Sequence, residues 1–230
     1  MEKAKLIKRY KRFLADVVLD GGREITAHVA NPGAMTGLAE PGSEVWLKLS
    51  PNKARKLPWS WELVRVGGGL VGVNTLQANA IVGAALEAGR IPELGGYQEI
   101  RREVPYGEGS RVDFLLSARG RPDCYLEVKS VTLREGDAAC FPDSKTARGA
   151  KHLDELARRV AAGDRAVTLF LAQRADCARF RVADWIDPAY GQAWLRAKAE
   201  GVETLCYACK VEVDGLDIAE KLPVELNGAF

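Results

Sequence analysis

The chain has 230 residues, of which 47% are hydrophobic and 28% are charged, so it is long enough to bury one large core or two small ones. Its first residues, MEKAKLIKRYKRF, lack the apolar core of a signal peptide, and no apolar run approaches the roughly 20 residues that cross a membrane. We therefore expect a cytoplasmic protein with no membrane partner. Five cysteines without a framework spacing agree, because an odd set fits reduced thiols better than disulfides.

The net charge of +2 is unevenly distributed. Residues 1–66 carry 12 Lys and Arg against 7 Asp and Glu, a net +5, which leaves 21 against 24, a net −3, for the remainder. A basic first third favours a polyanionic partner, although a solvated Lys and Arg surface explains the charge equally well.

The amino-terminal part of the chain predicts a small all-β domain. Short β-like runs lie at residues 13–19, 24–30, 44–50, 61–66 and 70–73, and they are separated by DGG, NPGAMTGLAEPGS, PNKARKLPWS and GGG. Several short strands with turn residues between them are typical of a small barrel or sandwich. About five strands in about 65 residues favour an OB-like barrel. We assign residues 1–70 to an OB-like nucleic-acid-binding domain.

From Thr75 onward the pattern changes to alternating helices and strands. A helix is predicted over residues 76–88, a strand over 97–104, a hairpin over 111–130, a helix over 144–163, a strand over 166–173, a helix over 188–201 and a strand over 202–213. Asp143 or Ser144 is expected to cap the helix that begins at 144. Residues 71–230 are therefore predicted to form an α/β domain with a mixed sheet.

The predicted hairpin, RVDFLLSARGRPDCYLEVKS, places three charged residues in two otherwise apolar strands. A turn centred on Gly120 pairs Leu116 with Cys124 and Asp113 with Glu127. Asp113, Glu127 and Lys129 then share one face, because side chains two apart on a strand point the same way. The other face is predicted to pack into a core and carries Val112, Phe114, Leu116, Leu126 and Val128.

Two carboxylates on directly opposed residues repel each other and need a cation between them. Either Lys129 alone supplies it, as a structural ion pair, or Asp113 and Glu127 hold a hard divalent cation, Mg²⁺ or Mn²⁺. A water that the metal polarises near a lysine is a nucleophile for phosphodiester hydrolysis. The catalytic candidates are Asp113, Glu127 and Lys129, and the metal-ligand candidates are Asp113 and Glu127.

This D-x13-E-x-K arrangement resembles the PD-(D/E)-x-K nuclease core. Over nearly its whole length the chain also resembles the sugar fermentation stimulation protein A family, in HVANPGAMTGL, ARKLPWSWELV, GYQEIRREVPYGEGSRVDFLL, YLEVKSVTL, FPDSKTARGAKHLDEL and WIDPAY. The resemblance implies a nucleic-acid-binding protein in which an OB-type domain is fused to a restriction-endonuclease-like domain, with a role in regulating sugar (maltose) metabolism. Asn79 stands where many such nucleases carry an acidic residue, and Glu103 is the alternative carboxylate.

Further candidates for nucleic-acid contact lie in four segments. RYKRF at residues 9–13 mixes aromatic and cationic side chains, a tight loop holds Asn31, PNKARKLPWSW sets cations beside Trp59 and Trp61, and the helix over 144–163 carries a polar stripe that also includes Glu155 and Arg159. Ordinary turns, core residues and an amphipathic helix explain the same patterns. The residues predicted to contact DNA are Arg9, Lys11, Arg12, Asn31, Lys53, Arg55, Lys56, Lys145, Arg148 and His152.

Two functions remain open from the sequence. In the first, the protein is a magnesium-dependent DNA hydrolase; in the second, the same domain holds DNA without cutting it and regulates sugar (maltose) metabolism genes. The DNA is single- or double-stranded in both readings, and RNA binding is less favoured. The cysteine pair in CYAC, Cys206 and Cys209, is half of a zinc-site pattern and is better explained as core.

Overall fold

The first six strands form one curved sheet that closes on itself. The computed structural model describes residues 1–107 and 109–225. In it the sheet order is β3–β2–β1–β4–β5–β6, and a parallel bridge between His28 and Ser60 joins β3 to β5 and closes the barrel. The strands are β1 (Glu2–Tyr10), β2 (Leu14–Leu19), β3 (Glu24–His28), β4 (Glu44–Leu49), β5 (Trp59–Val66) and β6 (Gly69–Gly72). The predicted OB-like barrel is confirmed.

Alternating apolar residues fill the interior of this barrel. Its fully buried members include Ala4, Leu6, Ala15, Val17, Val45, Leu47, Trp61 and Val64. The indole of Trp61 donates a hydrogen bond to the carbonyl oxygen of Leu63 at 2.8 Å, so its one polar atom is satisfied inside the core.

Strand β1 is absent from the strands predicted from the sequence. Its burial alternates, with Ala4 and Leu6 inside the barrel and Lys3 and Lys5 exposed. The alternation of lysines with apolar residues at positions 3–6 is that of an amphipathic strand.

A second, mixed six-stranded sheet forms the other domain, in the order β15–β14–β12–β9–β8–β7. Strands β9, β12 and β14 are parallel and the others are antiparallel, which confirms the predicted mixed sheet. The strands are β7 (Glu99–Tyr106), β8 (Ser110–Ser117), β9 (Cys124–Val131), β12 (Arg165–Ala172), β14 (Glu203–Glu212) and β15 (Gly215–Lys221). A small additional sheet is formed by β10 (Leu133–Glu135), β11 (Ala138–Phe141) and β13 (Arg179–Val182).

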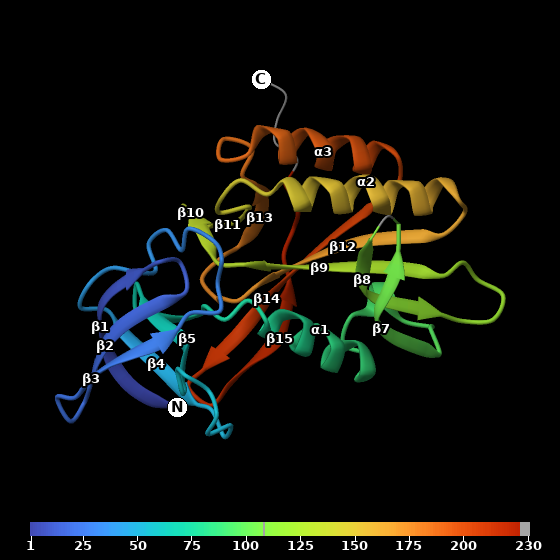
Figure 1. Cartoon of the computed structure of the whole chain (residues 1–230). Coiled ribbons are helices and arrows are strands. Elements are labelled where there is room, and N and C mark those ends of the chain that lie inside the picture. Colours follow the sequence, from blue (N-terminus) through green and yellow to red (C-terminus); the bar gives the residue numbers. More distant parts are fainter. Residues whose placement is uncertain (108, 226–230) are drawn as a thin grey trace.

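Helices cover both faces of the mixed sheet (Figure 1). Helix α1 (Gln77–Glu87) lies on one face, and α2 (Ala147–Ala161) and α3 (Pro188–Ala199) lie side by side on the other. A short 3-10 turn, η1, spans Pro92–Leu94. Among the described residues, no helix is long and apolar enough to cross a membrane. All five cysteines are free and buried, as expected for reduced thiols.

The hairpin of β8 and β9 follows the predicted register over only part of its length. Leu116 pairs with Cys124 and Phe114 with Leu126, but the ladder stops there and does not include Asp113 and Glu127. Val112 packs with the α2 core, whereas Phe114 packs with the α1 core, so the prediction that they share a face was wrong. The irregularity lies next to Glu103 of β7, whose φ is +52°, a value uncommon for a residue with a side chain.

Helix α2 begins three residues later than predicted. Thr146 caps it, because its side chain accepts a hydrogen bond from the backbone N–H of Gly149 at 3.1 Å. Asp143, which was expected to cap the helix, instead accepts a hydrogen bond from the backbone N–H of Met35 in the barrel at 3.1 Å. Ser144 donates to Asp143 and does not cap either.

The two domains are joined by hydrogen bonds as well as by the chain. Gly72 of β6 donates its N–H to the carbonyl oxygen of Gln173 at 2.7 Å, and the Gln173 side chain donates to the carbonyl oxygen of Asn74 at 3.2 Å. A separate contact between the domains joins Asp143 to Gly33 of the barrel. The Asp143 carboxylate lies so close to Gly33 that a Cβ on residue 33 would collide with it. Gly33 and Asp143 therefore form a tight contact between the barrel and the mixed-sheet domain.

We expect Gly33→Ala to destabilise the protein by about 1–3 kcal/mol, because overpacking at a close contact costs that much. In an Asp143→Ala background the added methyl group has room, so the same change should cost clearly less. Urea denaturation of the four proteins gives the difference, and Gly21→Ala, where an added Cβ meets nothing within 4 Å, is the matched control. An equal cost of Gly33→Ala in both backgrounds would contradict this contact.

Candidate active site

The three charged residues of the predicted hairpin lie beneath the amino-terminal half of α2. Asp113 comes from β8, Glu127 and Lys129 come from β9, and His152 reaches them from α2. Asn79 of α1 contacts Asp113. The site is therefore built by both strands of the hairpin and by one helix from each face of the sheet.

Glu127 is deeply buried in this site, with 3% of its surface exposed. Its Oε1 accepts a hydrogen bond from Lys129 Nζ at 2.6 Å and lies in short contact with His152 Nδ1. Its Oε2 is buried and accepts no hydrogen bond within residues 1–107 and 109–225. Burial favours the neutral acid, but the His152 hydrogen bond and the Lys129 charge outweigh it and lower the pKa of Glu127.

His152 is buried and is held from both ring nitrogens. Arg148 Nε donates to His152 Nε2 at 3.3 Å. A guanidinium only donates, so this contact assigns the lone pair to Nε2 and the proton to Nδ1, which faces Glu127. Lys129 Nζ lies 3.5 Å from the same Nδ1. Arg148, His152, Glu127 and Lys129 thus form one connected polar chain.

Asp113 is oriented by two hydrogen bonds. Val128 donates its backbone N–H to Oδ2 and Asn79 donates its side-chain amide to Oδ1, each at 2.7 Å. Burial and the charge of Glu127 nevertheless raise the pKa of Asp113 to about 6. Burial and the nearby negative charge together therefore outweigh the two hydrogen bonds, which favour the ionised form of Asp113.

Asn79 and Glu103 were the two residues considered for a third ligand. The side-chain amide of Asn79 donates a hydrogen bond to Asp113, so Asn79 acts as a positioning residue. Glu103 is exposed on the edge strand β7. Within the described chain, no group of three or more His, Cys, Asp and Glu side chains is arranged to hold a metal ion.

The acidic pair nevertheless has two features that fit a hard divalent cation. A buried carboxylate oxygen, Oε2 of Glu127, lacks a hydrogen-bond donor among the described residues, and burial together with the like charge of Glu127 raises the pKa of the neighbouring Asp113 carboxylate. A cation between them would relieve both effects, and Mg²⁺ or Mn²⁺ commonly binds one or two carboxylates with waters. Asp113 and Glu127 are the residues that would hold it.

Two further buried polar side chains, Glu155 and Tyr190, come from the helices α2 and α3 that cover this face of the sheet. Glu155 was placed on the outward polar stripe of its helix, yet it is 2% exposed and accepts a hydrogen bond from Ser110 Oγ at 3.0 Å. The Tyr190 hydroxyl is buried, and burial together with the charge of Glu127 raises the pKa of Tyr190. Tyr190 gave no sequence signal, because an aromatic residue on a helix is ordinarily core.

Two residues predicted to contact nucleic acid have structural roles. The Arg9 guanidinium donates to four backbone carbonyl oxygens, those of Arg12, Asn31, Gly33 and Ala34. Asn31 is 2% exposed, donates to the carbonyl oxygen of Val73 and accepts from the N–H of Gly33. Arg9 and Asn31 shape the loop that meets Asp143, and their contact with DNA stays a prediction.

The remaining basic residues of the barrel lie on its surface. Lys53 and Lys56 are exposed, and Arg55 is half-buried and donates to Ser60 Oγ at 3.3 Å. Trp59 is half-buried, whereas Trp61 is fully buried and is not available to stack on a base. Lys11 and Arg12 are exposed at the turn between β1 and β2, with φ values of +46° and +67°.

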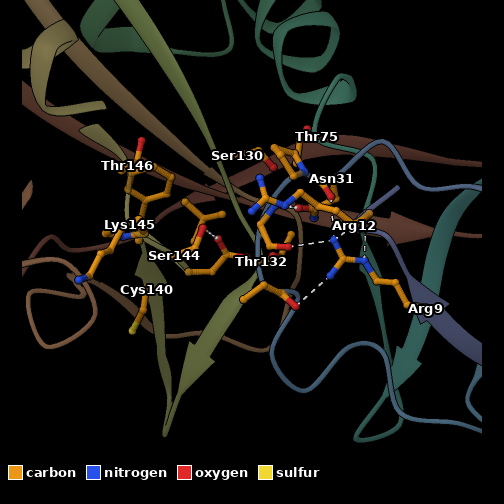
Figure 2. Close-up of a pocket in the computed structure, with 17 residues that line it drawn as sticks. Arg9, Arg12, Asn31, Thr75, Ser130, Thr132, Cys140, Ser144, Lys145 and Thr146 are labelled. Carbon is orange, nitrogen blue, oxygen red and sulfur yellow. Dashed lines mark hydrogen bonds between the residues drawn. The ribbon is translucent and has the colours of Figure 1, made fainter. Parts of the chain in front are cut away.

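Arg12 and Lys145, predicted from segments more than a hundred residues apart, line the same cavity between the two domains. The cavity has a volume of about 770 Å³, and Figure 2 shows the two side chains on opposite sides of it. Lys145 precedes α2, whereas Arg148 and His152 belong to the polar chain around Glu127. The sequence did not indicate this cavity, because it exists only where the domains meet.

The barrel followed by a mixed-sheet domain with an acidic pair and a lysine on its hairpin defines a class of protein, an OB-type domain fused to a restriction-endonuclease-like domain. Family models agree: the SfsA N-terminal OB domain matches residues 7–73, and the sugar fermentation stimulation protein RE domain matches residues 76–215. The chain therefore belongs to the sugar fermentation stimulation protein family.

Curated relatives are similar over nearly their whole length. A sugar fermentation stimulation protein homolog from Paramagnetospirillum magneticum is 57% identical over 225 residues, which cover 98% of this chain and 95% of the relative. The homolog from Rhodospirillum centenum is 55% identical over 220 residues, with 95% and 94% covered. The solved structure of Pyrococcus furiosus SfsA in complex with Ca²⁺ has a TM-score of 0.89 at 26% identity and covers 98% of this chain and 96% of its own.

The raised pKa of Asp113 predicts a pH-dependent stability difference. Because the folded state holds the Asp113 proton more tightly than the unfolded chain, its contribution is present below about pH 4 and is lost as pH rises through about 6. In metal-free buffer, Asp113→Asn should therefore gain stability relative to wild type as pH rises from 4 to 8, by roughly 1–3 kcal/mol. Chemical denaturation at several pH values measures it.

Asp217→Asn is the matched control, because the hydrogen bond from Arg90 lowers the pKa of Asp217. This control should show the opposite trend and lose stability relative to wild type as pH rises. If Asp113→Asn tracked wild type at every pH, burial and the charge of Glu127 would not be raising the pKa of Asp113 in the folded protein.

Proposed function

We propose that this protein binds DNA and hydrolyses its phosphodiester bonds with Mg²⁺ or Mn²⁺ held by Asp113 and Glu127. The observation that carries this proposal is the acidic pair: buried Glu127 keeps its Oε2 without a donor in the described chain, and burial together with the charge of Glu127 raises the pKa of Asp113. The relative from Pyrococcus furiosus was solved in complex with Ca²⁺, which supports cation binding by this fold.

The side chains around the pair have separate roles in this proposal. The backbone N–H of Val128 and the amide of Asn79 orient Asp113, and His152, itself held by Arg148, orients Glu127. A bound divalent cation supplies Lewis acidity toward a water or a phosphate oxygen. With that charge balancing Glu127, the Lys129 ammonium is free to contact the nucleophile or a phosphate oxygen.

Binding to DNA is supported by the position of the exposed cations. Lys53 and Lys56 lie on the barrel, Arg12 and Lys145 line the interdomain cavity, and Arg148 lies next to His152. Cations on both domains would meet the phosphates of one nucleic acid, which is the sequence-independent term in such complexes. We place the protein in the cytoplasm, where five buried thiols stay reduced.

A non-catalytic regulator of sugar (maltose) metabolism genes is the second candidate, and one observation favours it. Lys129 and His152 already contact Glu127 Oε1, so the carboxylate has a partial counter-charge without a metal. If Lys129 serves only that purpose, the site is a structural ion pair and the domain holds DNA without cutting it.

Lys129→Met separates these two functions. If Lys129 assists the reaction, the variant should fold and bind DNA like wild type but lose roughly 10²-fold or more of the cleavage rate, and extra metal should not restore it. Labelled single- and double-stranded DNA and RNA, incubated with metal-stripped protein with and without Mg²⁺ or Mn²⁺, provide the readout. Lys210→Met, at an exposed position near the end of β14, is the control and should cleave normally.

Normal cleavage by well-folded Lys129→Met would remove Lys129 from the reaction. Binding without cleavage by wild-type protein under every metal tried would instead support the regulator.

A further inference from the structure

The cavity between the domains contains two cations that the protein itself does not neutralise. Arg12 and Lys145 form no side-chain hydrogen bond or ion pair within residues 1–107 and 109–225, and both line the cavity from opposite sides (Figure 2). The other two charged residues of its wall form hydrogen bonds to the backbone: Arg9 donates to four carbonyl oxygens, and the Asp143 carboxylate accepts from the N–H of Met35. The cavity therefore has a surplus of positive charge, which favours an anion.

Hydroxyl groups and one aromatic ring complete the wall. Ser130 accepts a hydrogen bond from Gln173 Nε2 at 2.7 Å, so its own hydroxyl hydrogen remains available to a ligand. Thr132 lies two residues further along the same segment and also lines the cavity. Phe141, half-buried, is its aromatic member. Paired cations, hydroxyls and an aromatic ring are together the groups that bind a nucleoside phosphate.

The position of the cavity relates it to the acidic pair. Strand β9 carries Glu127 and Lys129 and runs directly into Ser130, at the cavity wall. At about 3.3 Å per residue, three residues of strand separate Glu127 from Ser130 by roughly 10 Å. Because three residues separate them, the Ser130 and Glu127 side chains point to opposite faces of the sheet, so β9 places the cavity near the acidic pair but not on the same face.

We propose that this cavity binds one unpaired nucleotide, with its phosphate between Arg12 and Lys145 and its base against Phe141. The volume of about 770 Å³ lies in the range of pockets that enclose small ligands. A base stacked in a duplex does not enter such a pocket unless it leaves the stack. This inference rests on the proposed DNA binding and names the form of substrate, a single strand or an unpaired end.

The test uses the full-length protein in EDTA, so that binding is measured without cleavage. Fluorescence anisotropy with a short single-stranded oligonucleotide and with a closed hairpin duplex compares wild type, Arg12→Gln and Lys145→Gln. Each variant should bind the single strand about tenfold more weakly, with a salt slope reduced by about 0.7, and should lose clearly less affinity for the duplex. Arg158→Gln, an exposed charge at the far end of α2, is the matched control and should change neither.

Calorimetric titration with dAMP distinguishes a free nucleotide from a strand. If wild-type protein binds dAMP and both cavity variants lose that binding, a free nucleotide is sufficient to occupy the cavity. If the variants lose affinity only for the oligonucleotide, the cavity binds a nucleotide only as part of a strand. Single-strand binding unchanged in both variants, or an equal loss for strand and duplex, would overturn the inference and leave the proposed function standing. If wild-type protein bound no DNA, the proposed function would be wrong. The dAMP titration would then test the cavity by itself, and absence of dAMP binding would overturn the inference as well.

Discussion

The buried carboxylate of Glu127 is the constraint around which the mixed-sheet domain is arranged. A charge at 3% exposure costs several kcal/mol unless partners compensate it. Lys129 supplies one compensation from the same strand, and His152 supplies another from α2, where Arg148 fixes the ring. Asp113 opposes them with a second negative charge. Helix α2 therefore has two roles over β9: His152 contacts the Glu127 carboxylate, and its apolar residues pack into the core.

The barrel contributes to the same arrangement through its junction with the second domain. Arg9 and Asn31 shape the loop whose Gly33 and Met35 meet Asp143, and Asp143 precedes α2 by four residues. This contact fixes the loop that leads into the helix carrying His152. It also forms one wall of the cavity that holds Arg12 and Lys145. The cations on the barrel and the acidic pair on the sheet are thus held in fixed positions relative to each other, as the proposed binding of a nucleic acid across both domains requires.

Much of the fold followed from local patterns, whereas the details of the site depended on tertiary contacts. The hairpin register was predictable because Gly120 fixes the turn and side chains alternate with period two. It failed at Asp113 and Val112, since an irregularity beside Glu103 has no signature in the sequence. The polar stripe of α2 indicated His152 but misplaced Glu155, which is buried. Arg9 resembled a phosphate ligand, and only the folded loop shows that it binds carbonyl oxygens.

Calorimetric titration of metal-stripped protein with Mn²⁺ tests the central claim most directly, namely that Asp113 and Glu127 form a cation site. Wild-type protein should bind Mn²⁺ with modest affinity, and Asp113→Ala should abolish that binding while Asp217→Ala, a surface carboxylate paired with Arg90, leaves it intact. Equal Mn²⁺ affinity in wild type and Asp113→Ala would contradict the claim and would leave Lys129 as the counter-charge of a structural ion pair.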